Sequence, residues 1–311
     1  MKTSTRILLV AAACAAIPGT ALAHGFAGKR FFPATLATDD PFVADELSLP
    51  TLARRNLGAG DDGPAVQQSS VSVDIAKRIT PRLGVELGAS YLRLKSGEGI
   101  VRGFDNLSAG AKYQFHMDEA RESIASVGVD WDIGNTGARR IGAESFSTVT
   151  PALFMGKGFG DLPDGVRFLK PLALTASLGV TMPTRSSTTT VDEDGNASVE
   201  RHPDALKVGL AVEYSLPYLQ SFVKDVGLPE PFSRMIPVVE LDLAKPFDRG
   251  GGSWTGTVNP GILWAGRTVQ VGLEAVIPVS SATGGGKGVL LQLHFFLDDL
   301  FPRTLGRPLL P

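Results

Sequence analysis

Hydrophobic and polar residues alternate along most of the chain with a period of two. In residues 288–301, Val289, Leu291 and Leu293 fall on one parity, whereas Gln292 and His294 fall on the other. A period of two predicts a β-strand that has one apolar face and one mixed face. This stretch near the end of the chain serves as the reference for finding the other strands.

The same alternation recurs from residue 70 onward. Thr80, Pro81 and Arg82 interrupt it as a short turn, so the two stretches around them predict a hairpin. Most stretches are close to the ~9–11 residues that a tilted transmembrane strand needs. The predicted strands are residues 70–79, 83–94, 107–117, 125–133, 146–159, 172–182, 206–216, 238–244, 254–264, 269–279 and 288–301.

The short turn at residues 80–82 makes one further strand necessary. In outer-membrane barrels the short turns face the periplasm and the strand number is even. A strand must therefore precede residue 70, and residues 42–52 alternate weakly through Phe42, Ala44, Leu47 and Leu49. The predicted fold is all-β: a transmembrane, antiparallel, up-and-down β-barrel of about 12 strands. Outward loops are expected at residues 54–68, 95–105, 134–145, 184–204, 247–253 and 281–287.

One connection on the periplasmic side is too long for a turn. Within residues 217–235, Leu219, Phe222, Val223 and Val226 have helical spacing. We expect a short amphipathic helix there, which plugs or flanks the periplasmic rim.

Residues 1–23 have the pattern of a cleavable signal peptide. Lys2 and Arg6 form a basic start, a short apolar run follows, and residues 21–23 (Ala-Leu-Ala) form a cleavage site that leaves His24 as the mature N-terminus. The only cysteine, Cys14, lies in this segment, where a lipidation site is the alternative. The expected organisation is a signal peptide (1–23), an N-terminal segment with the first strand (24–66), a β-barrel (67–301) and a C-terminal tail (302–311).

The predicted signal peptide and the positions of the aromatic residues both favour a membrane barrel. Export to the outer membrane of a Gram-negative cell implies two partners, outer-membrane lipid and the barrel assembly machinery. Aromatic residues fall towards strand ends, where membrane barrels carry aromatic girdles. The alternative is a soluble periplasmic β-domain, and the net charge of −2 provides no basic surface for nucleic acid. These aromatic residues are Tyr91, Tyr113, Trp131, Trp254 and Trp264.

The hairpin of residues 75–91 and the closing strand resemble the outer-membrane β-barrel family labelled "MetA-pathway of phenol degradation", over roughly residues 66–301. The resemblance implies a transporter for small, often hydrophobic or aromatic compounds. The chain departs from the usual barrel ending, since residues 302–311 follow Phe301.

The polar parity of the predicted strands collects more acids than bases. We expect an acidic, water-filled lumen that favours cations or dipolar solutes, and hence a passive channel for a small-molecule solute. The alternative is a non-conducting structural barrel whose interior is packed by paired charges and water. The residues predicted to line the lumen are Asp74, Glu86, Lys112, His116, Asp130, Asp132, Lys207, Glu213, Glu240, Asp242 and Glu274.

Catalysis and cofactor binding find little support in the residues. His24 could chelate copper with its own α-amine, but His116, His202 and His294 lie far apart, so no metal or cofactor is expected. The alternative function, a lipid-modifying enzyme, would need a Ser/His pair, and the chain has no G-x-S-x-G motif. Residues 284–287 lack the spacing of a phosphate loop. We therefore expect a protein that is not an enzyme.

Overall fold

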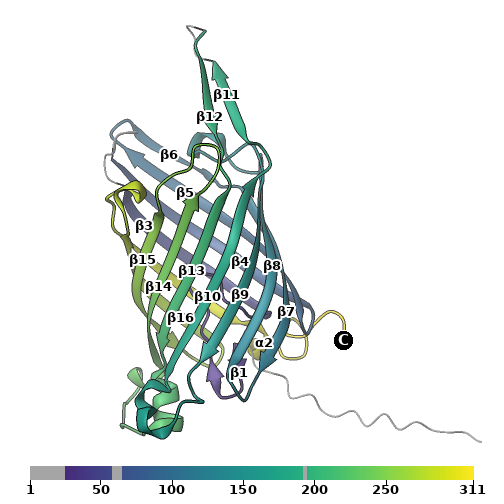
Figure 1. The fold of residues 1–311 in the computed structure, drawn as a ribbon, viewed down its shortest axis with the longest axis vertical. Coiled ribbons are helices and arrows are strands. Elements are labelled where there is room, and N and C mark those ends of the chain that lie inside the picture. The colour runs from purple at the N-terminus through teal and green to yellow at the C-terminus, as the bar shows by residue number, and fades with distance from the viewer. Residues whose placement is uncertain (1–24, 58–64, 192–194) are drawn as a thin grey trace, which may run out of the picture.

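Twelve long antiparallel strands close into a barrel in the computed structural model, which describes residues 25–57, 65–191 and 195–311 (Figure 1). Each strand pairs with its neighbour along the chain, and the last strand pairs with the first. The strands are β3 (Glu46–Leu57), β4 (Val66–Thr80), β5 (Leu83–Ser96), β7 (Leu107–Asp118), β8 (Ser123–Ile133), β9 (Thr148–Gly158), β10 (Leu172–Pro183), β13 (Ala205–Tyr214), β14 (Met235–Pro246), β15 (Thr255–Ala265), β16 (Val269–Pro278) and β17 (Gly288–Phe296).

The alternation in the sequence becomes the two faces of the barrel wall. On β13, Val212 points outward and is 38% exposed, whereas Ala211 and Glu213 point inward and are almost fully buried. The outer face carries a broad apolar surface, which includes Leu87, Tyr113, Trp131, Leu178, Leu273 and Leu291. A closed barrel leaves no unpaired strand edge, so this wall satisfies the condition for crossing a bilayer.

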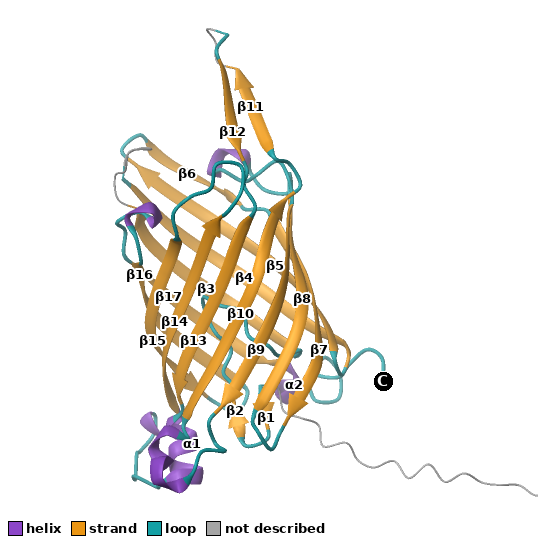
Figure 2. Cartoon of the chain, viewed as in Figure 1, coloured by secondary structure: helices purple, strands orange, loops and turns teal. Residues whose placement is uncertain are grey.

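The two ends of the barrel differ. At one end a hairpin of β11 (Ser187–Val191) and β12 (Ala197–Arg201) projects beyond the barrel, and β6 (Gly99–Phe104) extends the wall beside β5. At the other end lie the turns α1 (Leu216–Tyr218), η3 (Leu219–Val223) and η4 (Phe232–Arg234) (Figure 2). We call these the β11 end and the α1 end. The connection that the sequence predicts to be helical lies at the α1 end. It flanks the rim of the barrel and does not fill the lumen. None of the helices in the described part of the chain is long and apolar enough to span a membrane.

Several strand boundaries differ from the prediction, and the largest differences are in the first and the last strand. The first strand begins at Glu46, because residues 42–44 are buried inside the barrel and do not join the ladder. The closing strand ends at Phe296, where the chain turns into α2 (Leu297–Leu300) and the Leu297 amide donates to the Asp45 carbonyl over 2.9 Å.

The C-terminal tail packs along the α1 end of β4. The amides of Leu309 and Leu310 donate to the carbonyls of Arg78 and Ile79, and Lys77 Nζ donates to the Leu305 carbonyl over 2.7 Å. The tail thus caps the rim beside the first hairpin. The predicted signal peptide, Cys14 and His24 lie outside the described residues.

Candidate functional site

The α1 half of the lumen is filled by residues 25–45, which we call the N-terminal segment. It begins with a small hairpin of β1 (Phe26–Ala27) and β2 (Arg30–Phe31) and then runs into the barrel as irregular chain. It forms side-chain hydrogen bonds to five strands around the barrel: β4, β7, β8, β14 and β16. Contact with strands all around the wall places the segment inside the lumen.

A single buried carboxylate holds the middle of the segment. Glu240 on β14 is fully buried, and it accepts hydrogen bonds from the amides of Leu36 (2.7 Å), Ala37 (2.9 Å) and Thr38 (2.7 Å). The Thr38 hydroxyl donates a fourth bond of 2.9 Å. Hydrogen bonds to a charged acceptor are stronger than neutral ones, so this carboxylate clasp is a main attachment of the segment.

Three further contacts fix the carbonyls of the segment. Gln270 Nε2 donates to the Ala34 carbonyl over 2.7 Å, and Lys112 Nζ donates to the Asp40 carbonyl over 2.6 Å. The hydroxyl of Ser126 donates to the Pro41 carbonyl. Side chains of the wall therefore satisfy backbone groups of the segment. For this reason the segment does not have to join the sheet as a thirteenth strand.

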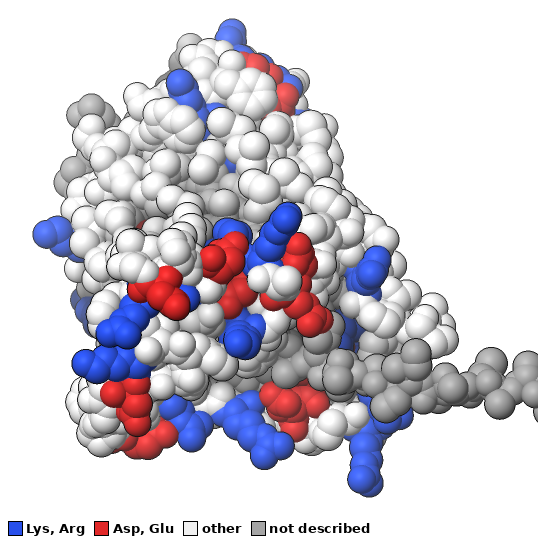
Figure 3. Space-filling model, turned by 60° about the horizontal axis from the view of Figure 1, so that its bottom comes forward, with Lys and Arg blue, Asp and Glu red and all other residues white. Residues whose placement is uncertain are grey.

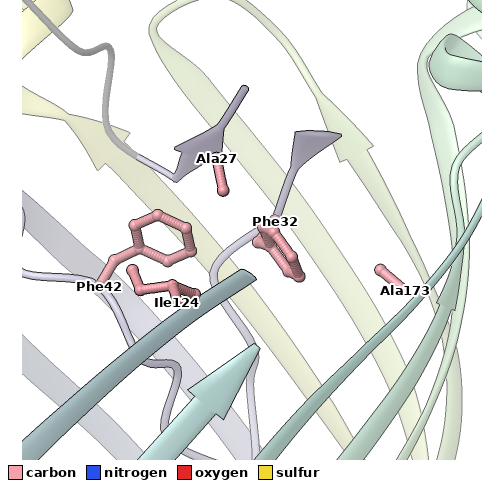
Figure 4. Close-up of a cluster of buried hydrophobic side chains, with 5 residues drawn as sticks. All are labelled: Ala27, Phe32, Phe42, Ile124 and Ala173. Atoms are coloured by element: carbon pink, nitrogen blue, oxygen red, sulfur yellow. The ribbon is translucent and has the colours of Figure 1, made fainter. Parts of the chain in front are cut away.

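Apolar packing completes the attachment. Phe32 and Phe42 contact each other with tilted rings whose centroids are 5.5 Å apart, and they pack with Ile124 of β8 and Ala173 of β10 (Figure 4). Further along, Leu36 packs against a second buried cluster that contains Leu263.

Two wall glycines make room for the segment. A Cβ at Gly272 would lie 2.5 Å from Leu36, and one at Gly209 would lie 3.3 Å from the Thr38 Cβ. The wall and the segment are therefore complementary in shape at these positions.

A buried ion pair anchors the hairpin at the α1 end. Arg30 is fully buried, and its Nε donates to Glu122 Oε2 over 3.2 Å. The guanidinium also donates to the carbonyls of Lys170 and Pro171, and it stacks over the Tyr218 ring at 3.8 Å from the centroid. One side chain of the segment thus joins three separate connections between strands.

Tyr218 closes this network on the other side. Its hydroxyl donates to Glu122 Oε1 over 2.9 Å, while the Gly160 amide donates to Oε2 over 3.0 Å. Burial, together with the hydrogen bond to Glu122, raises the pKa of Tyr218 to about 12. The phenol is therefore protonated, and it remains a donor throughout the neutral pH range.

The structure places the residues predicted to line the lumen on the inward face of the wall, with the exception of His116. Ladder partners share a face, and each of these residues is paired with a neighbour on the inward side. They are Asp74, Glu86, Lys112, Asp130, Asp132, Lys207, Glu213, Glu240, Asp242 and Glu274.

His116 points out of the barrel, so its assignment to the lumen was wrong. A bulge between Gln114 and His116 shifts the register of β7, and His116 pairs with the outward-facing Ala125. A bulge reverses the parity of every residue beyond it, which puts Met117 inside against the Phe32 cluster. Alternation read along one strand cannot reveal such a shift.

The inward residues divide into two levels. At the level of the segment, Glu213, Glu240 and Glu274 are buried, and the Glu274 carboxyl lies against Glu240 and Asn259. Elsewhere, Glu86, Asp130, Asp132 and Lys207 are inward but exposed to water. The lumen is thus closed at the three buried acids, whereas space remains beside Phe42 of the segment, where Glu86 and Asp130 of the wall line a cavity.

Two further side chains face inward, Arg55 and His294, and the sequence did not predict either of them to line the lumen. Arg55 on β3 faces inward opposite Gly288 and adds a base to the acidic interior. His294 is 2% exposed, with Nδ1 2.9 Å from the Ser48 hydroxyl and Nε2 3.3 Å from Glu46 Oε2. The sequence did place His294 on the polar parity of its strand, but only the closure of β17 on β3 brings Ser48 and Glu46 to it.

Among the described residues, no group of three or more His, Cys, Asp or Glu side chains has the geometry to hold a metal ion. The copper alternative at His24 falls outside the described residues.

Comparison with known proteins gives similarity of fold. No protein-family model matches the chain, and no curated protein sequence matches it. Among solved structures, the NanC porin is 7% identical with a TM-score of 0.46, covering 79% of this chain and 98% of its own. The β-domain of the Bordetella autotransporter BrkA is 12% identical with a TM-score of 0.47, covering 82% and 99%. The KdgM porin is 9% identical with a TM-score of 0.42, covering 79% and 98%.

Proposed function

We propose that this protein is an outer-membrane channel for small solutes whose path is closed by the N-terminal segment. The observation that carries the proposal is the segment itself, which fills the lumen yet is held by side chains and not by the hydrogen-bonded sheet. Such a segment can leave without opening the barrel. The apolar outer wall supports placement in a membrane, and the predicted signal peptide supports export.

The charge of the lumen determines which solutes it favours. Carboxylates outnumber bases on the inward face, so the potential favours cations and neutral dipolar molecules over anions. Hydrophobic or aromatic solutes are the class that the family resemblance implies, and the inward residues by themselves argue only for the charge preference.

A reversible disulfide between segment and wall tests the proposal. The Cβ position at Gly209 lies 3.3 Å from the Thr38 Cβ, close to the ~3.5–4.5 Å of a disulfide. The variant carries Thr38→Cys and Gly209→Cys, with Ser177→Ala to remove a hydroxyl that would lie too close, and Cys14→Ser to leave no other thiol.

Planar-bilayer recording then compares the same molecules before and after reduction. We expect silence in the oxidised state and cation-selective steps, with increased open probability, after reduction. Equal conductance in both states would show that the path does not pass the segment. Silence in both states, together with silence of a Glu240→Gln variant, would contradict the channel and favour the structural barrel.

A second candidate function, a lipid-modifying hydrolase, has one observation in its favour. Ser48, His294 and Glu46 lie in the order of nucleophile, base and orienting acid. Against this, His294 is buried. Its Nδ1 faces Ser48 and its Nε2 faces Glu46, whereas in a Ser-His-Asp triad Nε2 faces the serine and Nδ1 faces the acid. We therefore place the protein with channels. Covalent labelling by a fluorophosphonate that disappears in Ser48→Ala would reverse this choice.

A further inference from the structure

A cavity of about 710 Å³ lies at the α1 end, at the mouth of the lumen. It is bounded by the β1–β2 hairpin of the N-terminal segment, the α1 and η3 turns, the connection between β15 and β16, and the end of β17. Figure 3 brings this end of the molecule forward and shows charged side chains of both signs gathered around it, whereas the wall above is mostly uncharged.

Aromatic side chains form the walls of the cavity. Phe26 and Phe31 lie 5.1 Å apart between centroids, and Phe31 meets Phe296 edge to face at 6.1 Å. On the opposite side, Tyr218 and Phe222 lie 4.9 Å apart, and Phe222 is 50% exposed. The rings are already packed against one another, so the apolar surface is preformed and does not require a partner to assemble it.

Basic side chains line the cavity together with these rings. Lys29 and Arg267 are exposed, and neither forms an ion pair with another described residue. Lys29 Nζ lies 5.4 Å from the centroid of Phe222, which places its charge beside the apolar wall. A third base, Arg234, is bound to Glu230 over 2.6 Å, and one carboxylate, Asp299, also lines the cavity.

Volume and charge together define what fits. A cavity of this size is within the ~300–1,000 Å³ that drug-sized ligands occupy, and it is far too large for an inorganic ion. Apolar aromatic walls favour a ring or a compact hydrocarbon body, and the two bases without an ion pair favour an acidic group on it.

We propose that this cavity binds a small amphipathic anion, with its apolar body between Phe31 and Phe222 and its acidic group at Lys29 and Arg267. The site lies at the α1 mouth of the barrel, where the hairpin of the segment meets the connections between strands. It does not rest on the proposed channel function, because binding there does not require the barrel to conduct. It differs from the lumen in sign: the lumen favours cations, whereas this cavity favours an anion.

A matched pair of fluorescent probes tests the proposal on the full-length protein held in a neutral amphipathic polymer. Anilinonaphthalene sulfonate carries the acidic group, and N-phenylnaphthylamine has the same ring skeleton without it. The test variant is Lys29→Ser with Arg267→Ser. The control is Arg121→Ser, which removes an exposed base (78% of its side chain) at the same end but outside the cavity.

We expect saturable binding of the sulfonate that weakens about tenfold in the double variant, as for the loss of two exposed charge contacts. The neutral probe should bind equally to wild type and the double variant, and the Arg121→Ser control should bind both probes as wild type does. Phe222→Ser should weaken both probes. An equal loss for both probes in the double variant, an equal loss in the Arg121→Ser control, or the absence of saturable sulfonate binding would each overturn the proposal.

Discussion

Thr38 donates two hydrogen bonds to Glu240, one from its amide (2.7 Å) and one from its hydroxyl (2.9 Å), across 202 residues of sequence. This pair connects an irregular stretch of chain to the wall of the barrel that encloses it. Because the wall is closed by strand pairing alone, the pair helps to hold the segment in the lumen and is not needed for the barrel to close.

Removing the charge of Glu240 should loosen the N-terminal segment. Glu240→Gln keeps the size of the side chain but replaces a charged acceptor of four hydrogen bonds, each worth ~1.5–3 kcal/mol when charged. We expect faster hydrogen–deuterium exchange across residues 32–42 and more frequent channel opening. The control is Asp132→Asn, an inward carboxylate on β8 that accepts a hydrogen bond from Thr148 Oγ1 of β9 over 2.8 Å; it should leave exchange in the segment unchanged.

Breaking the Arg30–Glu122 pair should release the hairpin of the segment. Arg30→Met leaves the Glu122 carboxylate buried with one partner fewer, which costs ~3–5 kcal/mol for a buried pair. Exchange of residues 25–31 should rise, while the barrel keeps its strand content by circular dichroism. Adding Glu122→Gln should recover part of the loss, and failure of the second change to recover anything would argue against the pairing.

The hydrogen bond from Tyr218 should make the α1 end sensitive to alkaline pH. Its pKa is raised from 10.0 to about 12, so the folded state holds the proton more tightly than the unfolded chain. The stabilisation is fully present below pH 10 and is lost as the pH rises towards 12. The melting temperature, measured from about pH 8 to about pH 12, should fall in the wild type as the pH passes these two pKa values. It should fall less in Tyr218→Phe, which has no phenol to titrate. Identical profiles would show that Tyr218 does not titrate with this shift.

The two faces of β13 should respond oppositely to a charge. Leu210→Arg places a base on the lipid-facing wall and should cost ~2–4 kcal/mol in bilayers. Gly209→Arg points inward, where it meets Thr38, and should leave the barrel inserted but displace the segment. Urea unfolding in lipid vesicles measures the first effect, and hydrogen–deuterium exchange measures the second. Failure of insertion with Gly209→Arg alone would mean that the faces are inverted.

Selectivity of the opened channel should depend on the inward carboxylates. In the reduced disulfide variant, Asp130→Asn with Asp132→Asn should lower the preference for cations, measured as a shift of reversal potential towards zero in a salt gradient. Asp161→Asn is the control, because Asp161 lies at the α1 end outside the lumen and pairs with Lys157. An equal shift of reversal potential in the Asp161→Asn control would show that Asp130 and Asp132 do not set the selectivity.

Most of the strands could be predicted from the sequence. Alternation placed Val208, Leu210 and Val212 outward and Glu213 and Glu240 inward, because a closed wall between lipid and lumen imposes one environment on each parity. The same reasoning predicted the helical connection at residues 217–235, where the spacing changes from two to nearly four. A hairpin turn and an even strand number then led to the missing first strand, although its boundary was four residues too early at Phe42.

The tertiary structure alone decided what fills the lumen. The N-terminal segment has no period, since its backbone is satisfied by side chains from distant strands, and neither Arg30–Glu122 nor Thr38–Glu240 leaves a local signal. The outward turn of His116 has the same cause, because a bulge is visible only in the pairing with β8. By itself, the sequence determined the two faces of the wall, since alternation is a local response to the environment on each side. The closed end of the lumen came from contacts such as Lys112–Asp40 and Gln270–Ala34, which join residues 72 and 236 positions apart and which no local pattern records.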